Sequence, residues 1–452
     1  MSITLEDLAA FCRRRGFVYQ ASSLYGGLQG FFDYGPLGVE LKNNIKNAWW
    51  KELVLLRDDV FGLDSAVVMH KNVLNYSGHV DTFHDVLIDC KDCKVRFRDD
   101  EMNGNPACPK CASTNLSQPR NFNLMMNVNL GPTHSTEGIL RPETAQGVFV
   151  NFKNICDSFS PSLPFGIAQI GKAFRNEITP RNFVFRCREF EQMELEFFVT
   201  EEKSDEFFKY WVEQRLNWWR KIGVTNIRIL EQNKEELAHY SKATTDICFE
   251  FPHGFEEIEG IANRGDFDLG SHTKMQDQFE IRAKVKHNVD SVDKLSVFDG
   301  QKHFIPSLVE TSAGLDRAFL AVLTSAYTVE ELPDGSSRIV LKFVPKLAPV
   351  KVSVIPLAKN NEKIVEFARN LYKNLKENDI LPVVLENGGN IGKCYRKNDE
   401  IGTPFCVTVD FDTIGQGDPD LVNSVTVRDR DSMEQKRVKT VDLVAFLKAA
   451  LG

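Results

Sequence analysis

The sequence lacks an apolar run long enough to cross a membrane as a helix, so we expect no membrane partner. Its first residues, MSITLEDLAAFCRRRG, lack the apolar stretch of a secretion signal and carry early acids, which argues against a transit peptide as well. Internal repeats and low-complexity segments are also missing, so nothing indicates a solenoid or a disordered tail. We therefore expect a cytoplasmic protein.

The sequence also has no excess of positive charge, because its formal net charge is -8 and its pI is near 5.7. This balance excludes a uniformly basic coat for nucleic acid, but it is compatible with local basic patches. Hydrophobic residues make up 42% of the chain and charged residues 26%, which is typical of a globular protein. At 452 residues the chain exceeds one ordinary core, so we expect two or three domains.

Four of the ten cysteines form two Cys-x2-Cys pairs, at Cys90, Cys93, Cys108 and Cys111. This is zinc-ribbon spacing, in which four thiolates bind one tetrahedral ion. A redox pair or a site that has lost its metal is the alternative. The other cysteines are scattered without a disulfide framework, which indicates free thiols in a reducing compartment.

Residues 165–199, FGIAQIGKAFRNEITPRNFVFRCREFEQMELEFFV, predict a strand, a loop and a second strand. Side chains alternate along a strand. One face carries Phe190, Gln192, Glu194 and Glu196, and the other carries Glu191, Met193, Leu195 and Phe197. An ordinary half-buried strand would turn the polar face to solvent. The loop arginines, Arg181 and Arg186, favour a binding site instead, because guanidinium suits phosphate and carboxylate suits an ammonium group or an adenine amine.

Three further stretches carry candidate functional residues. In GILRPETAQG, Glu143 suits an α-ammonium group, although an acid near a helix start also has a purely electrostatic explanation. FIPSLVETSAGLDRAFLAVL predicts strand, turn and helix, with Arg317 at the positive end of the helix, where a bound phosphate would explain it. From about residue 340 a proline-bearing connector leads into a compact α/β unit. Its clustered cations are either a binding surface or solvated surface: Lys393, Arg396, Lys397, Arg428, Arg430, Lys436, Arg437 and Lys439.

FRNE, the arginine-bearing loop and REFEQME together resemble motif 2 of the class II aminoacyl-tRNA synthetases, and their wording is similar to the homodimeric glycyl-tRNA synthetases. DYGPLGVELKNNIKNAWW resembles motif 1, RPETAQG is similar to the family's own string, and residues 304–323 resemble motif 3. GKCYRKNDEIGTPFCVTVDF and VTVRDRDSMEQ resemble the family's anticodon-binding domain. The matches occur in order along nearly the whole chain.

The resemblance implies an α+β fold with a class II catalytic domain built on an antiparallel sheet at residues 1–345. Within it, motif 1 would span about residues 30–60, motif 2 about 165–199 and motif 3 about 304–323, with a zinc-ribbon-like insertion at 85–120. An α/β anticodon-binding domain would follow at 346–452. The implied activity is that of a glycine–tRNA ligase, which activates glycine with ATP to glycyl-adenylate and transfers glycine to the 3′ end of tRNA(Gly). The implied cofactors are Mg2+ with ATP and a structural Zn2+, and the implied assembly is a homodimer.

The resemblance also implies roles for individual residues. Arg175 and Arg317 would be catalytic, with Arg175 on the α-phosphate and Arg317 on the outer phosphates. The implied ATP site comprises Arg175, Asn176, Glu177, Phe185, Arg186, Cys187, Arg188, Glu189, Phe190, Glu257, Ile258, Gly314, Leu315, Asp316 and Arg317. The implied glycine site comprises Arg98, Glu143, Phe190, Glu191, Gln192, Met193, Glu194, Glu310, Thr311, Ser312, Ala313 and Gly314. Glu257 and Glu310 would hold Mg2+.

One helix has two possible explanations. A helix from Pro36 would carry Leu37, Leu41, Ile45 and Trp49 along one side. This stripe either packs in the chain's own core or, as motif 1 implies, contributes to a subunit interface.

Three other functions compete with the glycine enzyme. One is another class II synthetase of the same subgroup, such as the threonyl, prolyl or histidyl enzyme. The second is a synthetase-like accessory subunit that binds nucleic acid without catalysis, but such relatives lose arginines that this chain keeps. The third, a generic ATP-binding protein, leaves the C-terminal unit unexplained.

Overall fold

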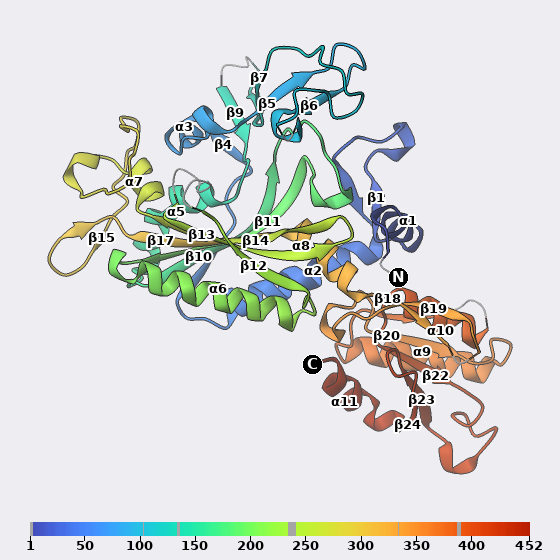
Figure 1. Ribbon diagram of the computed structural model, residues 1–452. Coiled ribbons are helices and arrows are strands. Elements are labelled where there is room, and N and C mark those ends of the chain that lie inside the picture. The colour runs from blue at the N-terminus through green and yellow to red at the C-terminus, as the bar shows by residue number, and fades with distance from the viewer. Residues whose placement is uncertain (1–2, 103, 133–135, 234–240, 333, 387–389) are drawn as a thin grey trace.

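The computed structural model describes residues 3–102, 104–132, 136–233, 241–332, 334–386 and 390–452 (Figure 1). A large sheet with helices on both faces forms the main body, an arm with two small sheets rises from it, and a C-terminal unit stands out from the body. Helices and antiparallel-rich sheets are mixed, which confirms the predicted α+β class. No helix among the described residues is both long and apolar enough to cross a membrane.

The main sheet has seven strands in the order β12-β13-β14-β17-β11-β10-β3. All neighbours are antiparallel except β10 and β3, which run parallel. The strands are β3 (Val60–Leu63), β10 (Phe165–Phe174), β11 (Glu189–Val199), β12 (Ile227–Glu231), β13 (Ala243–Phe251), β14 (Gly254–Gly265) and β17 (Ser307–Gly314). The predicted strand–loop–strand at 165–199 is therefore β10 and β11 at the centre of the sheet.

Helices cover the two faces of this sheet unequally. On one face α2 (Pro36–Trp50), α6 (Ser204–Lys221) and α8 (Leu315–Ala326) bury the largest core, which includes Trp49, Trp211 and Leu195. On the other face α5 (Ala145–Phe159) and α7 (Phe267–His272) cover only one end, with Phe152 against Phe198. The rest of this second face is available for a binding site.

The apolar stripe of α2 packs in the chain's own core. Leu41, Ile45 and Trp49 are fully buried there, and Leu37 packs against the same cluster. The core-packing explanation therefore holds for this stripe, and a subunit interface would have to use other side chains.

The arm contains the Cys-x2-Cys pairs. One three-stranded sheet has the order β4-β9-β8 and the other the order β6-β5-β7. Their bounds are β4 (Val68–His70), β8 (Met126–Leu130), β9 (Thr136–Leu140), β5 (His84–Asp89), β6 (Arg96–Arg98) and β7 (Arg120–Asn123). The short helices α3 (Lys71–Tyr76) and α4 (His79–Thr82) lie at its base. The small core around Cys90 and Cys108 includes Ile88, Phe97 and Leu116 and is separate from the main core.

Among the described residues three hairpins lie outside these sheets, two on the body and one beside the C-terminal unit (Figure 1). The first, of β1 (Val18–Gln20) and β2 (Phe32–Tyr34), follows α1 (Leu5–Arg15). The second pairs β15 (Val297–Phe298) with β16 (His303–Phe304). The third pairs β18 (Tyr327–Glu331) with β19 (Ser337–Leu341) and follows directly on α8.

The C-terminal unit is a five-stranded sheet with three helices and its own core. The strand order is β21-β20-β22-β23-β24, with parallel pairs around β20 and antiparallel pairs beyond β22. The strands are β20 (Val352–Pro356), β21 (Val383–Leu385), β22 (Phe405–Val409), β23 (Ser424–Asp429) and β24 (Gln435–Lys439), and the helices are α9 (Glu362–Glu377), α10 (Ile391–Glu400) and α11 (Thr440–Leu451).

Candidate active site

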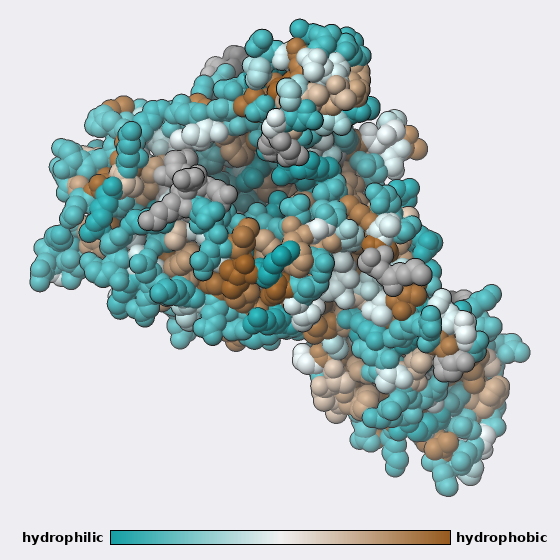
Figure 2. Space-filling view, viewed as in Figure 1, coloured by the Kyte–Doolittle hydropathy of each residue, from teal (hydrophilic) through white to brown (hydrophobic). Residues whose placement is uncertain are grey.

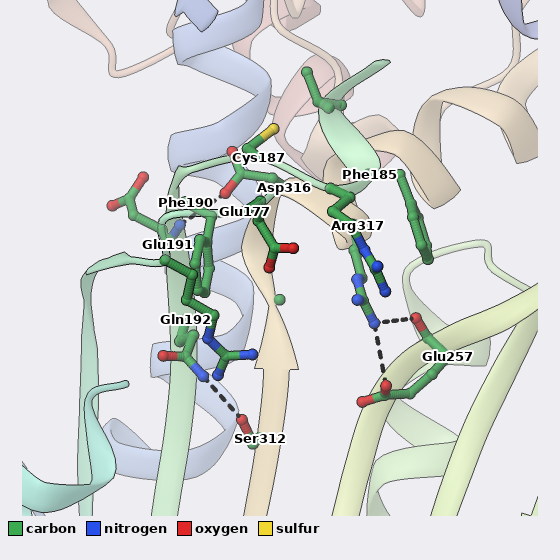
Figure 3. A pocket seen from close by; sticks show the side chains of 14 residues that line it. Glu177, Phe185, Cys187, Phe190, Glu191, Gln192, Glu257, Ser312, Asp316 and Arg317 are labelled. Carbon is green, nitrogen blue, oxygen red and sulfur yellow. Dashed lines mark hydrogen bonds and ion pairs between the residues drawn. The ribbon is translucent and has the colours of Figure 1, made fainter. Parts of the chain in front are cut away.

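A cavity of about 200 Å³ opens on the incompletely covered face of the main sheet (Figure 3). Its lining comes from β11, the loop before it, β14, β17 and the start of α8. The lining residues are Arg175, Glu177, Val184, Phe185, Arg186, Cys187, Phe190, Glu191, Gln192, Glu257, Ser312, Gly314, Asp316 and Arg317. In the space-filling view a hydrophilic hollow lies below the arm (Figure 2). Residues 165–199 and 304–323, which resemble motifs 2 and 3, thus meet around one cavity.

The polar face of β11 is buried beneath this region. Gln192, Glu194 and Glu196 are at most 7% exposed, so the alternative of a solvent-facing polar strand is wrong for them. The antiparallel register places Glu194 opposite Ser312 and Glu196 opposite Glu310 on β17. Alternation along two neighbouring strands therefore assembles an acidic cluster that neither strand has alone.

Arginines mark one side of the cavity. Arg317, in the first turn of α8, lies over the Phe185 ring at 4.3 Å and donates from Nη1 to the carbonyl (2.9 Å) and carboxylate (3.2 Å) of Glu257 (Figure 3). Arg175 lies 5.3 Å from the centre of the Phe190 ring. Burial lowers the pKa of Arg186, and neighbouring arginines add to this effect. A pocket that gathers several cations suits a polyanion.

A second network braces the cavity from behind. The Lys42 ammonium of α2 donates to Asp316 (3.0 Å) and is paired with Glu191 at 2.6 Å. The other Asp316 oxygen accepts from the Glu191 backbone N–H at 2.7 Å, and the Tyr34 hydroxyl also donates to Asp316. These contacts fix the start of α8, and with it Arg317, against β11.

Glu194 is the centre of a buried hydrogen-bond network. It accepts from Ser312 Oγ at 2.6 Å, from Gln192 Nε2 at 2.7 Å and from the Thr144 hydroxyl. The Thr144 backbone N–H in turn donates to Gln192 Oε1 at 3.2 Å. The start of α5 is therefore tied to the floor of the cavity by residues of the RPETAQG string.

Further acids continue this network under the sheet face. Glu143 is paired with His79 at 3.3 Å and accepts from Gln146 Nε2 at 3.0 Å. Arg264 forms two 2.7 Å hydrogen bonds with Asp268 and one of 3.1 Å with Glu310.

These acids have strongly displaced pKa values. Burial raises the pKa of Glu310 to about 8 and raises that of Glu194, while nearby acids add to both shifts. Burial and Glu310 also raise the pKa of Glu196 well above its ordinary value, and neither Glu196 carboxylate oxygen has a partner among the described residues. Burial alone would raise the pKa of Glu143, but His79 and Arg264 hold it well below its ordinary range. A buried excess of acid suits an incoming cation such as an ammonium group.

Some predicted site residues do not line the cavity. Met193, Ala313, Leu315 and Ile258 belong to the main hydrophobic core, and Thr311 is fully buried. Arg188 donates to the Glu177 carbonyl, Glu189 pairs with Lys172, and the Asn176 backbone N–H donates to the Leu124 carbonyl. Arg98, from the arm, lies 3.5 Å from Asp85. Glu143, Glu194 and Glu310 form the acidic cluster just described, beyond the cavity wall.

Several residues in and around the site are not predicted from the sequence. Arg141 is buried and donates to the Lys172 and Ser65 carbonyls, and Thr144 binds Glu194. Both lie in the RPETAQG string, in which only Glu143 was singled out. Arg264 and Asp268 form a buried ion pair, but Arg264 lies at the end of β14 and Asp268 in α7, so helical spacing does not predict it. Lys42 gave no signal, because its partners are remote in sequence.

The four cysteines of the arm come together as their spacing predicts. The ligand sulfurs of Cys90, Cys93, Cys108 and Cys111 all lie within 4.8 Å of one another. Two of the distances are 3.6 Å (Cys90 to Cys111) and 3.7 Å (Cys93 to Cys108). Hydrogen bonding from the Cys93 backbone lowers the pKa of Cys90 to about 6, which favours a thiolate.

Comparison of the sequence with known proteins identifies the family of this chain. Residues 132–293 match the family model described as "tRNA synthetase class II core domain (G, H, P, S and T)", and residues 351–450 match "Anticodon binding domain". The chain is 50% identical to a glycine–tRNA ligase of Thermus thermophilus, with 99% of each chain covered. The chain belongs to the glycine–tRNA ligase family. It is also 49% identical to the ligase of Deinococcus radiodurans (99% of each covered) and 48% identical to that of Borreliella afzelii (99% of this chain and 98% of the relative).

Membership of the glycine–tRNA ligase family confirms the predicted resemblance. The relatives named here are glycine enzymes, so the rival prediction of a threonyl, prolyl or histidyl enzyme has no support from them. The accessory-subunit alternative also loses ground, because Arg175, Glu177, Phe190 and Arg317 all line the one cavity. The homodimeric type remains a prediction.

Proposed function

We propose that the chain is a glycine–tRNA ligase, which forms glycyl-adenylate from glycine and ATP and then transfers glycine to the 3′ end of tRNA(Gly). One observation carries the proposal most directly. The arginine side of the cavity and the buried acidic side are joined by one strand, β11, so a polyanion and an ammonium group can be held next to each other.

Activation is the attack of the glycine carboxylate on the α-phosphorus of ATP, with pyrophosphate leaving. Both reactants are anions, so the site must hold them in line and stabilise the charge of the transition state. Arg175 is the residue we assign to the α-phosphate, and Arg186 and Arg317 to the outer phosphates. Each of them lines the cavity. This chemistry requires charge and position rather than a general base.

The adenine would occupy the part of the cavity next to Phe190. We assign Phe190 to stacking on the ring and the Glu177 carboxylate to the adenine amine. The guanidinium of Arg175 also faces the Phe190 ring, so base and α-phosphate would be bound by neighbouring groups.

Glycine offers no side chain, so recognition must use its charged ends and selectivity must come from exclusion. Glu194 and Glu143 are the acids we assign to the ammonium group, with Gln192 and Ser312 beside them. A substrate methyl group would have to displace buried, hydrogen-bonded groups, at a cost of about 2–5 kcal/mol.

Magnesium would accompany ATP, and carboxylate oxygens are its natural protein ligands. Glu257 fits this role, because its side chain lines the cavity and is 47% exposed beside Arg317. Glu310 fits less well, because it lies outside the lining and already accepts from Arg264. When bound, Mg2+ supplies neutralisation of phosphate charge.

Zinc in the arm is a second proposal. A tetrahedral Zn–thiolate site with bonds of about 2.3 Å has sulfur–sulfur edges of about 3.8 Å. The observed separations of 3.6 and 3.7 Å fit that size. The ion would order the arm, which carries Arg98, and the charge of Arg98 helps to lower the pKa of Arg186.

We further propose that the C-terminal unit binds the anticodon region of tRNA(Gly), in agreement with the family model that it matches. Two members of the cationic cluster predicted for this unit do not lie on its surface. Arg428 and Arg430 are buried, so a positive surface is wrong for these two. Any RNA contact would come from exposed cations such as Lys393 and Arg396. A cytoplasmic homodimer remains part of the proposal.

The first test is ATP–pyrophosphate exchange with purified protein and each amino acid singly, followed by charging of tRNA with the active one. We expect exchange with glycine alone. Exchange with another amino acid would overturn the pocket assignment, and no exchange by folded protein supplied with Mg2+, zinc and tRNA would favour the accessory-subunit alternative. Light scattering of the same sample, with a mass of two chains expected, tests the homodimer.

A further inference from the structure

The C-terminal unit meets the body at a narrow waist (Figures 1 and 2). The waist consists of the β18–β19 hairpin and the connector that follows it. Independent domains joined by a connector move relative to each other unless their interface restrains them. The contacts across this waist therefore decide whether the C-terminal unit is loosely tethered or held in one orientation.

One buried carboxylate at the waist is shared by both parts. Asp399, on α10 of the C-terminal unit, accepts from Arg338 Nη1 of the hairpin at 2.8 Å. It also accepts from Arg428 of its own unit, at 2.8 and 3.1 Å. The side chains of Arg338 and Asp399 are only 3% and 2% exposed. A charge buried this deeply is held in place by its partners, because leaving it unpaired is costly.

Other contacts restrain the same junction. Arg430 of the C-terminal unit donates to the Phe343 carbonyl of the connector at 2.8 Å, and Arg15 of α1 pairs with Glu400 of α10. Asn44 of α2 donates to the Leu347 and Ala348 carbonyls at 3.1 Å each. The connector is thus fixed by hydrogen bonds at both of its ends.

The hairpin is also continuous with the site. α8 carries Arg317 in its first turn and ends at Ala326, and β18 begins at Tyr327. The hairpin that holds Asp399 is therefore joined to the cavity through the length of α8. A change in the orientation of the C-terminal unit would move an RNA bound there relative to Arg317.

We propose that Arg338 and Asp399 are positioning residues, which fix the C-terminal unit so that an RNA bound by it presents its 3′ end to the cavity. The inference rests on the proposed function, since it concerns the transfer step to tRNA. The restraint should affect only one of the two half-reactions. Glycine activation needs only the body, whereas transfer to tRNA needs the body and the C-terminal unit in a fixed relative orientation. Loss of the restraint spreads the RNA over many orientations and lowers its effective concentration at the site.

The test compares Arg338→Met with a matched control, Lys342→Met. Arg338 and Lys342 both pair with Glu330 of the hairpin, but only Arg338 crosses to the C-terminal unit. Arg338→Met leaves Asp399 with its partner Arg428, so the C-terminal unit keeps its internal ion pair. Small-angle X-ray scattering reports the spread of orientations independently of activity.

For Arg338→Met we expect glycine-dependent pyrophosphate exchange within about twofold of wild type, and kcat/KM for tRNA in charging lower by about tenfold or more. Its scattering should show a broader range of dimensions, and Lys342→Met should match wild type in every assay. Equal loss of exchange and charging, or unchanged charging, would overturn the inference. If Arg338→Met does not fold, Arg338→Lys serves instead, because it keeps the positive charge but loses the bidentate geometry of the guanidinium group. For this variant we expect an intermediate loss of tRNA charging and unchanged glycine-dependent exchange.

A wild-type protein that fails to charge tRNA with glycine would instead refute the proposed function. The role of Arg338 is refuted by a different result, namely a variant that charges tRNA as well as an active wild type does.

Discussion

At the scale of single residues, the site depends on buried acids, and burial raises the pKa of two of them, Glu194 and Glu310. Glu194 and Glu310 are buried on neighbouring strands, and both have raised pKa values. Among the described residues, Arg264 is a cation that lies close to them and donates to Glu310 at 3.1 Å. A bound ammonium group would supply positive charge to this acidic cluster, so glycine binding should depend on both Glu194 and Glu310.

Replacing Glu194 with Ala should abolish glycine activation. The change removes the acceptor of Ser312, Gln192 and Thr144 and opens space where a methyl group is now excluded. We expect kcat/KM for glycine in pyrophosphate exchange to fall by about a hundredfold or more, since two to three kcal/mol of binding is lost. Glu213→Ala, on the exposed side of α6, is the control. Normal glycine activation by Glu194→Ala would contradict the assignment.

The KM for glycine should depend on pH through Glu310, whose charge acts on Glu194 and Glu143, the acids assigned to the ammonium group. Because burial raises its pKa to about 8, the group is largely protonated at neutral pH, and an ammonium ligand favours the ionised form. Glycine binding therefore releases protons, and KM should fall as pH rises from about 6.5 to about 8.5. Pyrophosphate exchange over this range, with KM for ATP measured in parallel, checks it. A KM for glycine that is flat or rises with pH would count against an acidic ammonium site.

At the scale of elements, the site is held by contacts between segments that are distant in sequence. α2, β11 and α8 meet through Lys42, Glu191 and Asp316. Each element was predictable from its own periodicity, and α2 and α8 begin where their sequences indicate. Ahead of α6, residues 201–203 form a 3-10 turn, so the α-helix itself begins at Ser204. The brace between elements was not predictable, because it depends on register.

Lys42→Met should destabilise the body of the protein. Lys42 is buried between two carboxylates, so its removal leaves both without their main cation. We expect a loss of about 3–5 kcal/mol in the free energy of unfolding, measured by urea denaturation. Lys46→Met is the matched control, because Lys46 pairs with the same Glu191 but is 28% exposed, and it should cost at most about 1 kcal/mol. Equal effects of the two variants would show that the brace is unimportant.

At the scale of the whole molecule, three units with separate cores are combined. The arm, the body and the C-terminal unit each bury their own cluster. The small core of the arm contains few large side chains, so an ion is the natural source of its stability.

Removing zinc should therefore unfold the arm alone. We expect one zinc per chain by elemental analysis of the purified protein. A strong chelator, or Cys108→Ser, should expose residues 90–111 to proteolysis while the urea midpoint of the body stays within about 0.5 M. Cys156→Ser, outside the cluster, is the control. Retained protease resistance without metal would indicate that the arm folds on its own core.

The sequence by itself determined the family, the α+β class and the local elements, because motifs and periodicities are properties of short segments. It also indicated the four cysteines, whose spacing brings their sulfurs together with little help from the rest of the fold. Only the tertiary structure decided that the polar face of β11 is buried as well as the apolar one, and that Glu196 has no partner among the described residues. It also decided that Arg428 and Arg430 are buried rather than displayed to RNA. Burial and partners depend on which distant segments pack together, and a charged side chain has the same letter in the sequence whether it lies at a surface or between two carboxylates.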